Sequence, residues 1–239
     1  MSQSKQYDAY KEFQNTMNTL GRRYELSRVF DDFLSLAICS FHRTNIQSKL
    51  MHKDPTNEEF YHSIINKYDQ KAIELFPKLL GALQLSVYNE PYSDLLGDYF
   101  TEHITRGQNG QFFTPQPICE LMSRINASDI TQGKRVYDPS CGSGRTLLSF
   151  AKHAPDNYFF GNDVSSTCAK MTTLNFFLNG LRGEVAWMNT LSHEWYSAWQ
   201  VNCQGIGILS VSKENSILYN EKPYTKKQQL HNKEQLTLF

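Results

Sequence analysis

The sequence lacks an excess of either charge. Its 239 residues include 24 lysines plus arginines and 24 aspartates plus glutamates, so the formal net charge is zero. Such a chain has no general attraction for phosphate, and binding to a nucleic acid would need a local basic patch. Hydrophobic residues make up 40% of the chain and aromatic residues 13%. This composition is sufficient for a packed core and argues against wholesale disorder.

Long apolar runs and paired cysteines are also lacking. No run approaches the roughly 20 residues that span a bilayer, and the N-terminal MSQSKQYDAYKEF has no apolar signal core. The cysteines lie far apart and form no CxxC pair or Cys/His cluster with metal-ligand spacing. We therefore expect reduced thiols, no metal site, no membrane segment and a cytoplasmic location. The cysteines are Cys39, Cys119, Cys141, Cys168 and Cys203.

The first half of the chain has the pattern of helices. Apolar residues recur at three- and four-residue steps over residues 25–41, 57–75 and 92–104. Asn57 is placed to cap the second segment, and Pro77 to break or kink it. The sequence therefore predicts a helical N-terminal domain over residues 1–107.

The pattern changes after Gly107. A polar loop leads into a short helix over 115–125, and short apolar runs then alternate with helical stretches. We expect strands at 135–137, 158–162, 184–188 and 205–211, with helices at 145–152 and 165–179. Strand–helix alternation predicts a parallel sheet, and hence an α/β domain over 108–211. The polar remainder, 212–239, is typical of a flexible tail.

The string VYDPSCGSGRTLLSF, residues 136–150, carries the strongest functional signal. A short strand ends in an acidic residue, a turn of small residues follows, and an apolar helix begins directly after it. Gly142 and Gly144 allow the backbone to approach a ligand closely. Ligands in such sheets bind at the carboxyl ends of the strands, where this turn lies.

Asp163 ends the next strand, about 20 residues after the glycine turn. A carboxylate at this spacing can accept hydrogen bonds from both hydroxyls of a ribose. The alternative role is to cap the following helix, as aspartate often does. Together with the glycine turn, the spacing favours the ribose role.

GQFFTPQPICELM followed by YDPSCGSGRTLL resembles the modification subunits of type I restriction systems and related N6-adenine DNA methylases. The resemblance covers roughly residues 94–190 and includes DLLGDYF at 94–100. It implies an incomplete Rossmann-like methyltransferase domain, S-adenosylmethionine as cofactor, and DNA as partner. Residues around the methionine end would be Gln111, Phe112, Phe113, Thr114 and Pro115. The main cofactor loop would comprise Asp138, Pro139, Ser140, Cys141, Gly142, Ser143 and Gly144. Asp163 would hold the ribose, and Asn189 and Thr190 would lie near the adenine.

One element of that family is missing. Its fourth strand is followed by Asn-Pro-Pro-Phe/Tyr, which orients the amine of a flipped-out adenine toward the methyl group. No such string occurs here; NEPY at 89–92 and NEKPY at 220–224 are interpreted as turns. The sequence therefore predicts no catalytic residues of its own. A sheet ending at the fourth strand would expose an edge, which a second subunit, a self-dimer or the tail could cover.

The last five residues, QLTLF, resemble the pentapeptide by which bacterial proteins dock on the DNA sliding clamp. Leu238 and Phe239 would fill an apolar pocket, with Gln235 at its rim and Leu236 beside it. The alternative is an amphipathic end that folds back onto its own domain.

These features leave three functional hypotheses open. The chain could be an adenine-specific DNA methyltransferase completed by another subunit, in a restriction-modification setting. It could instead be a cofactor-binding pseudo-methyltransferase that acts as an interaction or regulatory module, or a truncated remnant without activity. The Gln-Phe-Phe-Thr-Pro loop disfavours a small-molecule methyltransferase.

Overall fold

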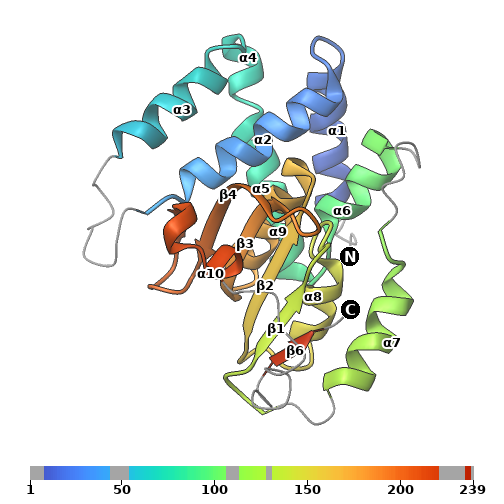
Figure 1. Cartoon of the computed structure of the whole chain (residues 1–239). Helices are drawn as coiled ribbons and strands as arrows, with labels where there is room; N and C mark the ends of the chain where they lie inside the picture. The colour runs from blue at the N-terminus through green and yellow to red at the C-terminus, as the bar shows by residue number, and fades with distance from the viewer. Residues whose placement is uncertain (1–7, 44–53, 106–112, 128–130, 221–234, 238–239) are drawn as a thin grey trace, which may run out of the picture.

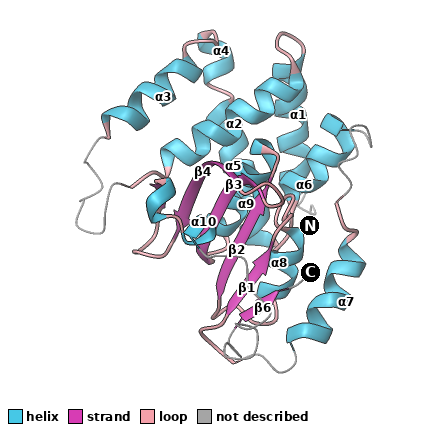
Figure 2. Cartoon of the chain, in the orientation of Figure 1, coloured by secondary structure: helices cyan, strands magenta, loops and turns pink. Residues whose placement is uncertain are grey.

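The computed structural model describes residues 8–43, 54–105, 113–127, 131–220 and 235–237. These residues form an α/β structure in which helices precede a sheet, which confirms the predicted fold class (Figure 1). Helices cover one face of the sheet in two successive layers, and a short helix lies on the other face (Figure 2). No helix in the described part is long and apolar enough to cross a membrane.

The N-terminal half is helical, as predicted, but its helices differ in number and extent. Asp8 begins an unpredicted first helix by accepting a hydrogen bond from the Lys11 N–H at 3.0 Å, and this helix buries Phe13, Met17 and Leu20. The elements are α1 (Ala9–Gly21), α2 (Leu26–Ser40), α3 (Pro55–Ile65), α4 (Gln70–Ile73), α5 (Phe76–Asn89), α6 (Leu95–Tyr99) and the π-helical turn η1 (Phe100–Thr105).

The prediction of one helix over 57–75, capped by Asn57, is wrong. Two helices, α3 and α4, occupy this stretch, and Asp54 caps α3 by accepting from the Thr56 N–H at 3.0 Å. The Asn57 side chain instead donates to the Cys39 carbonyl at 3.2 Å. Pro77 lies in the first turn of α5, where its missing N–H has no helical partner to lose.

The first three strands are parallel, as the strand–helix alternation predicts. Helices α8 and α9 connect them, and α7 precedes them. Asp138 at the end of β1 is in register with Gly161, and Asp163 at the end of β2 with Trp187, so the strands end along one edge of the sheet. The elements are α7 (Gln116–Ala127), β1 (Arg135–Asp138), α8 (Arg145–Ala151), β2 (Tyr158–Asp163), α9 (Ser166–Leu178) and β3 (Arg182–Asn189).

The expectation of an entirely parallel sheet is wrong. An unpredicted strand, β4 (Glu194–Val201), runs antiparallel to β3, and the predicted fourth strand, β5 (Ile208–Val211), runs antiparallel to β4. The connections between these strands are too short for a crossover, and only antiparallel neighbours can be joined by tight turns. The β5 edge is held by the chain after α2, where Ile208 N–H donates to the Phe41 carbonyl at 3.0 Å.

The tail returns to the sheet at two places. Residues 213–220 form the 3-10 turn η2 (Lys213–Asn215) and the helix α10 (Ile217–Asn220), so the flexible-tail prediction is wrong there. Buried Glu184 of β3 fixes this segment by accepting from Ser216 Oγ at 2.6 Å and Ile217 N–H at 3.0 Å. The strand β6 (Gln235–Thr237) pairs with β1 in parallel and completes the order β5-β4-β3-β2-β1-β6.

A hydrophobic core joins the helical half to the sheet. Phe30 and Leu34 of α2 belong to one buried cluster with Met171 and Leu174 of α9. The boundary predicted at 107/108 falls among residues outside the described ranges, so it stays a prediction. Helix α6 of the helical half and helix α9 of the α/β half both contribute to this core. The core therefore brings α6 next to the part of the sheet that carries the turn after β1.

Candidate functional site

The glycine turn after β1 forms one wall of the site. Gly142 and Gly144 adopt φ angles of 57° and 83°, a region that favours glycine, and Gly144 N–H donates to the Cys141 carbonyl at 2.7 Å. A Cβ atom at Gly142 would lie 2.9 Å from the Phe113 ring. Phe113, which belongs to the FFTP stretch (residues 112–115), therefore packs directly on the turn. The two stretches that the sequence predicted to meet are in contact.

A cavity of about 250 Å³ lies between these two stretches. This volume is close to the lower end of the range of about 300–1,000 Å³ that ligand sites usually have. Its lining is Phe113, Thr114, Met122, Asp138, Ser140, Cys141, Gly142, Ser143, Arg145 and Thr146. Met122, Arg145 and Thr146 were not predicted as site residues. The position of Arg145 and Thr146 directly after the glycine turn is the signal that could have identified them.

Asp163 contacts the turn but is not part of the cavity lining. Its Oδ2 accepts from Gly142 N–H at 2.9 Å, and its Oδ1 from Ser165 N–H at 2.8 Å. An ionised carboxylate has about four acceptor positions, so these contacts do not use its whole acceptor capacity. The side chain of Val164, next to it, is 64% exposed. Asp163 thus combines a structural contact with the turn and remaining capacity as an acceptor.

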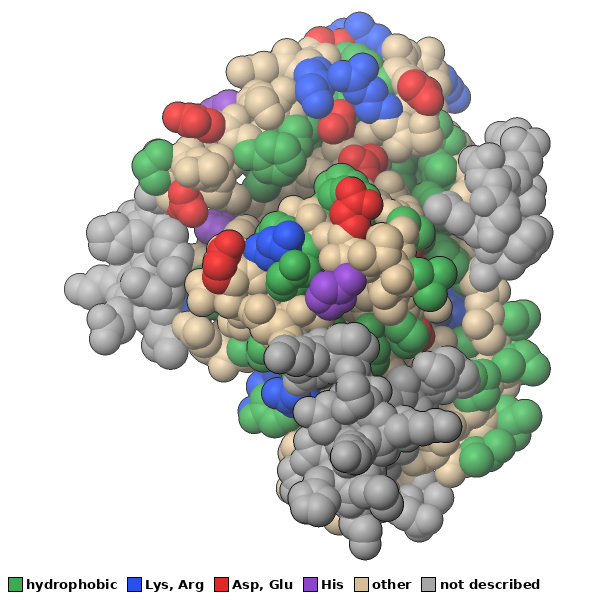
Figure 3. Space-filling view, viewed as in Figure 1, with side chains coloured by type: hydrophobic (Ala, Val, Ile, Leu, Met, Phe, Trp, Pro, Cys, Tyr) green, Lys and Arg blue, Asp and Glu red, His purple; other side chains and the backbone are tan. Residues whose placement is uncertain are grey.

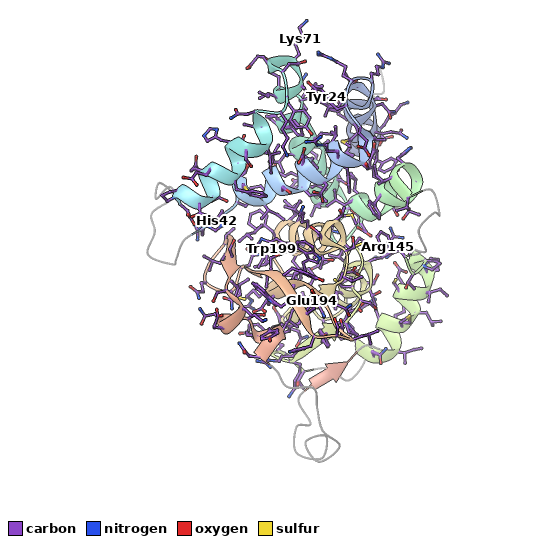
Figure 4. The ribbon with its side chains drawn as sticks, turned by 45° about the horizontal axis from the view of Figure 1, so that its top comes forward. Tyr24, His42, Lys71, Arg145, Glu194 and Trp199 are labelled. Atoms are coloured by element: carbon purple, nitrogen blue, oxygen red, sulfur yellow. The ribbon has the colours of Figure 1, made fainter. Side chains whose placement is uncertain are left out.

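The site has an acidic character. Burial raises the pKa of Asp138, and the nearby charge of Asp163 raises it further. Burial also raises the pKa of Asp163. The guanidinium of Arg145 is engaged by Asp94 at 2.9 Å and Asp98 at 2.5 Å, and Figure 4 shows this residue between the helical half and the sheet. A cationic ligand fits these surroundings better than an anionic one.

Several predicted residues support the turn from within the protein. Thr190 Oγ donates to the Pro139 carbonyl at 2.7 Å and accepts from the Asn162 side chain at the same distance. The Cys141 thiol is buried 3.4 Å from Thr172 Oγ, and burial raises its pKa well above the usual range. Ser140 N–H donates to Asp138 at 3.0 Å. These contacts fix the shape of the turn.

Asn189 and Pro115 have local roles in the backbone. The Asn189 side-chain oxygen accepts from the N–H groups of Leu191 and Ser192, at 3.0 and 3.2 Å, so it holds the turn that follows β3. The Pro115 carbonyl accepts from Ile118 N–H at 2.9 Å and starts α7. Gln111 and Phe112 lie outside the described residues.

One family model matches the part of the chain that contains this site. The family model "N-6 DNA Methylase" matches residues 87–236, more than half of the chain. The chain belongs to the N-6 DNA methylase family. That match spans the FFTP stretch, the glycine turn and Asp163, so the site described above lies within the family's own region.

Curated relatives of this family member are longer than the chain. It is 25% identical over 217 residues to the type I restriction enzyme MpnII methylase subunit of Mycoplasma pneumoniae, covering 84% of this chain and 38% of the relative. It is 30% identical over 133 residues to the MjaVII methylase subunit of Methanocaldococcus jannaschii, covering 51% of this chain and 22% of the relative. A type I methyltransferase subunit from Streptococcus thermophilus has a TM-score of 0.40 at 17% identity, covering 72% of this chain and 56% of that one.

Family membership implies S-adenosylmethionine as the cofactor, and the residues present fit this molecule. The acidic surroundings of Asp138 and Asp163 suit its positive sulfonium, and Asp163 keeps acceptor positions for a ribose. Phe113 and Met122 supply an apolar wall beside the cavity. Both the charge and the mixed polar and apolar lining match the chemistry of the nucleoside.

Proposed function

We propose that this family member binds S-adenosylmethionine across the glycine turn and acts as the cofactor-binding part of an N6-adenine DNA methyltransferase. One observation carries the proposal: Phe113 of the FFTP stretch and Asp163 both contact Gly142 of the glycine turn. The methionine end would occupy the cavity beside Phe113 and Thr114. The ribose would lie against Asp163, with the adenine near Val164 and the Asn189 amide.

The residues would bind and orient the cofactor, which when bound supplies an electrophilic methyl group. The Phe113 ring and the Gly142 backbone would exclude water from the methionine end. Asp138 and Asp163 would hold the ligand in one orientation by charge and hydrogen bonds. Positioning of this kind is a main source of rate enhancement in group transfer.

We also propose that the chain does not methylate DNA alone. The Asn-Pro-Pro-aromatic string that orients the target adenine does not occur in the sequence. The look-alike at residues 89–92 begins at Asn89, the last residue of α5, and continues into a turn in which Ser93 N–H donates to the Glu90 carbonyl at 3.2 Å. A partner polypeptide that carries this string would supply the missing part of the reaction. The alternative is a non-catalytic module that uses the bound cofactor as a structural or regulatory ligand.

Methyl transfer to mixed-sequence DNA tests this part of the proposal. The isolated chain, supplied with radiolabelled S-adenosylmethionine, is expected to transfer no label above a protein-free control. A full-length member of the same family serves as the positive control for the assay. Robust turnover by the chain alone would show that its own residues complete the catalytic site.

The affinity for S-adenosylmethionine is expected to fall as the pH is lowered toward about 4, and the fall should begin above the pH range in which an ordinary aspartate titrates. Asp138 and Asp163 have raised pKa values, so both lose their charge at a higher pH than ordinary carboxyl groups do, and a cation then loses its attraction. S-adenosylhomocysteine lacks the sulfonium charge, so its affinity should change less over the same range. Calorimetry at several pH values measures both ligands. Parallel pH profiles for the two ligands would contradict the electrostatic role.

The tail allows a second proposal. The backbone of residues 235–237 lies against β1, which agrees with the interpretation that the end folds back onto its own domain. Leu238 and Phe239 lie outside the described residues. We propose that the same pentapeptide can leave this position and dock on a sliding clamp. Titration of a clamp with the QLTLF peptide tests this, and an absence of binding at high micromolar concentration would refute it.

A further inference from the structure

Asp94 connects the helical half to the glycine turn, although it lies 44 residues before Asp138. It is the N-cap of α6 and comes from the DLLGDYF segment. The side chain is 2% exposed, and its Oδ1 accepts from Gly97 N–H at 2.9 Å, which starts the helix. A cap of this kind needs only one acceptor oxygen. The second oxygen is turned toward the cofactor loop.

The second oxygen, Oδ2, accepts from Ser143 in that loop and from Arg145, the first residue of α8. Ser143 Oγ donates at 2.5 Å, and Arg145 Nε at 2.9 Å. The Asn175 side chain of α9 completes the connection, because its amide donates to Asp94 Oδ1 at 2.9 Å and to the Ser143 carbonyl at 2.8 Å. Asp94 thus holds both the side chain and, through Asn175, the backbone of Ser143. Three elements of the fold meet at one buried carboxylate.

Gly97 shows how closely α6 approaches this carboxylate. A Cβ atom at this position would lie 2.1 Å from Asp94 Oδ2 and 2.5 Å from Ser143 Oγ. Only glycine leaves enough space for the helix backbone beside the two oxygens. The sequence therefore places a glycine where the helical half contacts the cofactor loop.

We propose that Asp94 is a positioning residue that holds Ser143 and the glycine turn in the shape that receives the cofactor. The inference rests on the proposed function, and it assigns a part of the cofactor site to the helical half of the chain. Asp94 does not line the cavity, whereas Ser143 and Arg145 do. Its effect on a ligand is therefore transmitted through these two residues. Binding of the cofactor would depend on the docking of α6 against α9.

Asp98 offers a matched control on the same helix. Arg145 donates to Asp98 at 2.5 Å, and the Asp98 side chain is 55% exposed. Replacement of either aspartate by asparagine removes one negative partner of Arg145 and conserves size. In the described residues only Asp94 also contacts Ser143 and Asn175. An asparagine there has an NH₂ group in place of one carboxylate oxygen. This group cannot accept from the donors at that position, so contacts with the turn are lost.

The test compares Asp94→Asn, Asp98→Asn and Ser143→Ala by calorimetry with S-adenosylmethionine and by amide hydrogen exchange without ligand. Asp94→Asn is expected to weaken binding about tenfold or more and to speed exchange at Gly142 and Gly144 by a similar factor, whereas Asp98→Asn changes both less than about twofold. Amides of Phe33 and Leu34 in α2 report global stability. In the double variant, the losses from Asp94→Asn and Ser143→Ala should not add, because both remove the same connection.

Faster exchange confined to the turn supports the proposal. Equal acceleration in the turn and in α2 would overturn it, because Asp94 would then serve general stability alone. Equal behaviour of Asp94→Asn and Asp98→Asn would also overturn it. If Asp94→Asn fails to fold, Ser143→Ala tests the same connection from the other side. If the unmodified protein binds no S-adenosylmethionine, the proposed function fails, and the exchange measurement still decides the role of Asp94.

Discussion

Replacement of Asp163 by alanine is expected to weaken the binding of S-adenosylmethionine by about 1–3 kcal/mol, or roughly 5- to 150-fold. The carboxylate accepts from the N–H groups of Gly142 and Ser165, one on each oxygen, and in the proposed complex its remaining acceptor capacity would serve the ribose hydroxyls. The alanine variant loses the ligand contacts and one support of the turn. Isothermal titration calorimetry of the two proteins measures the difference directly.

Two further variants separate these effects. Asp163→Asn keeps one acceptor oxygen, so its affinity should lie between those of the unmodified protein and Asp163→Ala. Asp156→Ala removes an exposed carboxylate that accepts from Gln132 at 3.1 Å, outside the cavity, and should leave the affinity unchanged. An Asp163→Ala affinity within about twofold of the unmodified protein would contradict the ribose role, since a charged hydrogen bond is worth about 1.5–3 kcal/mol.

Gly183→Ala is expected to destabilise the fold by about 3 kcal/mol or more, in the tail of the distribution for single substitutions. Gly183 of β3 is in register with Phe159 of β2, and a Cβ atom at this position would lie 1.6 Å from the Phe159 carbonyl oxygen. Backbone atoms in the middle of a sheet cannot yield without loss of their ladder hydrogen bonds. Urea-induced unfolding, followed by circular dichroism, measures the change.

Gly81→Ala is the matched control for this substitution. Gly81 lies in α5, and a Cβ atom there would meet no atom within 4 Å beyond its chain neighbours and the backbone of its own helix. Because alanine favours helices over glycine by about 0.5–1 kcal/mol, this variant should be as stable as the unmodified protein or slightly more stable. Similar unfolding midpoints for Gly183→Ala and Gly81→Ala would show that β2 and β3 do not pair in the register described.

The sequence predicted those parts of the site that depend on local signals. The run from Val136 to Phe150 combines a strand, a turn and a helix within a few residues, and each is dictated by its own composition. The spacing of Asp163 follows from one strand–helix–strand unit. Parallel strands end at a common edge, so these local signals were enough to place Asp163 beside Gly142.

Other features depend on partners that are distant in the sequence. Strand β4 has aromatic residues at Trp195, Tyr196 and Trp199, but its side chains do not alternate regularly between buried and exposed. The expectation of strand–helix alternation also left no place for a hairpin. Glu184 is fully buried because Ser216 and the first turn of α10 satisfy it, about 30 residues away. The contact of Asp94 with the glycine turn is of the same kind. No local pattern distinguishes such a carboxylate from an ordinary helix cap.

The most direct test of the cofactor site is calorimetry of the unmodified chain with S-adenosylmethionine at neutral pH, with adenosine triphosphate as a negatively charged control ligand. We expect saturable binding of one S-adenosylmethionine per chain and none of the triphosphate, since Asp138 and Asp163 would repel an anion. Absence of heat with S-adenosylmethionine at millimolar concentration, or tighter binding of the triphosphate, would contradict the assignment of this pocket.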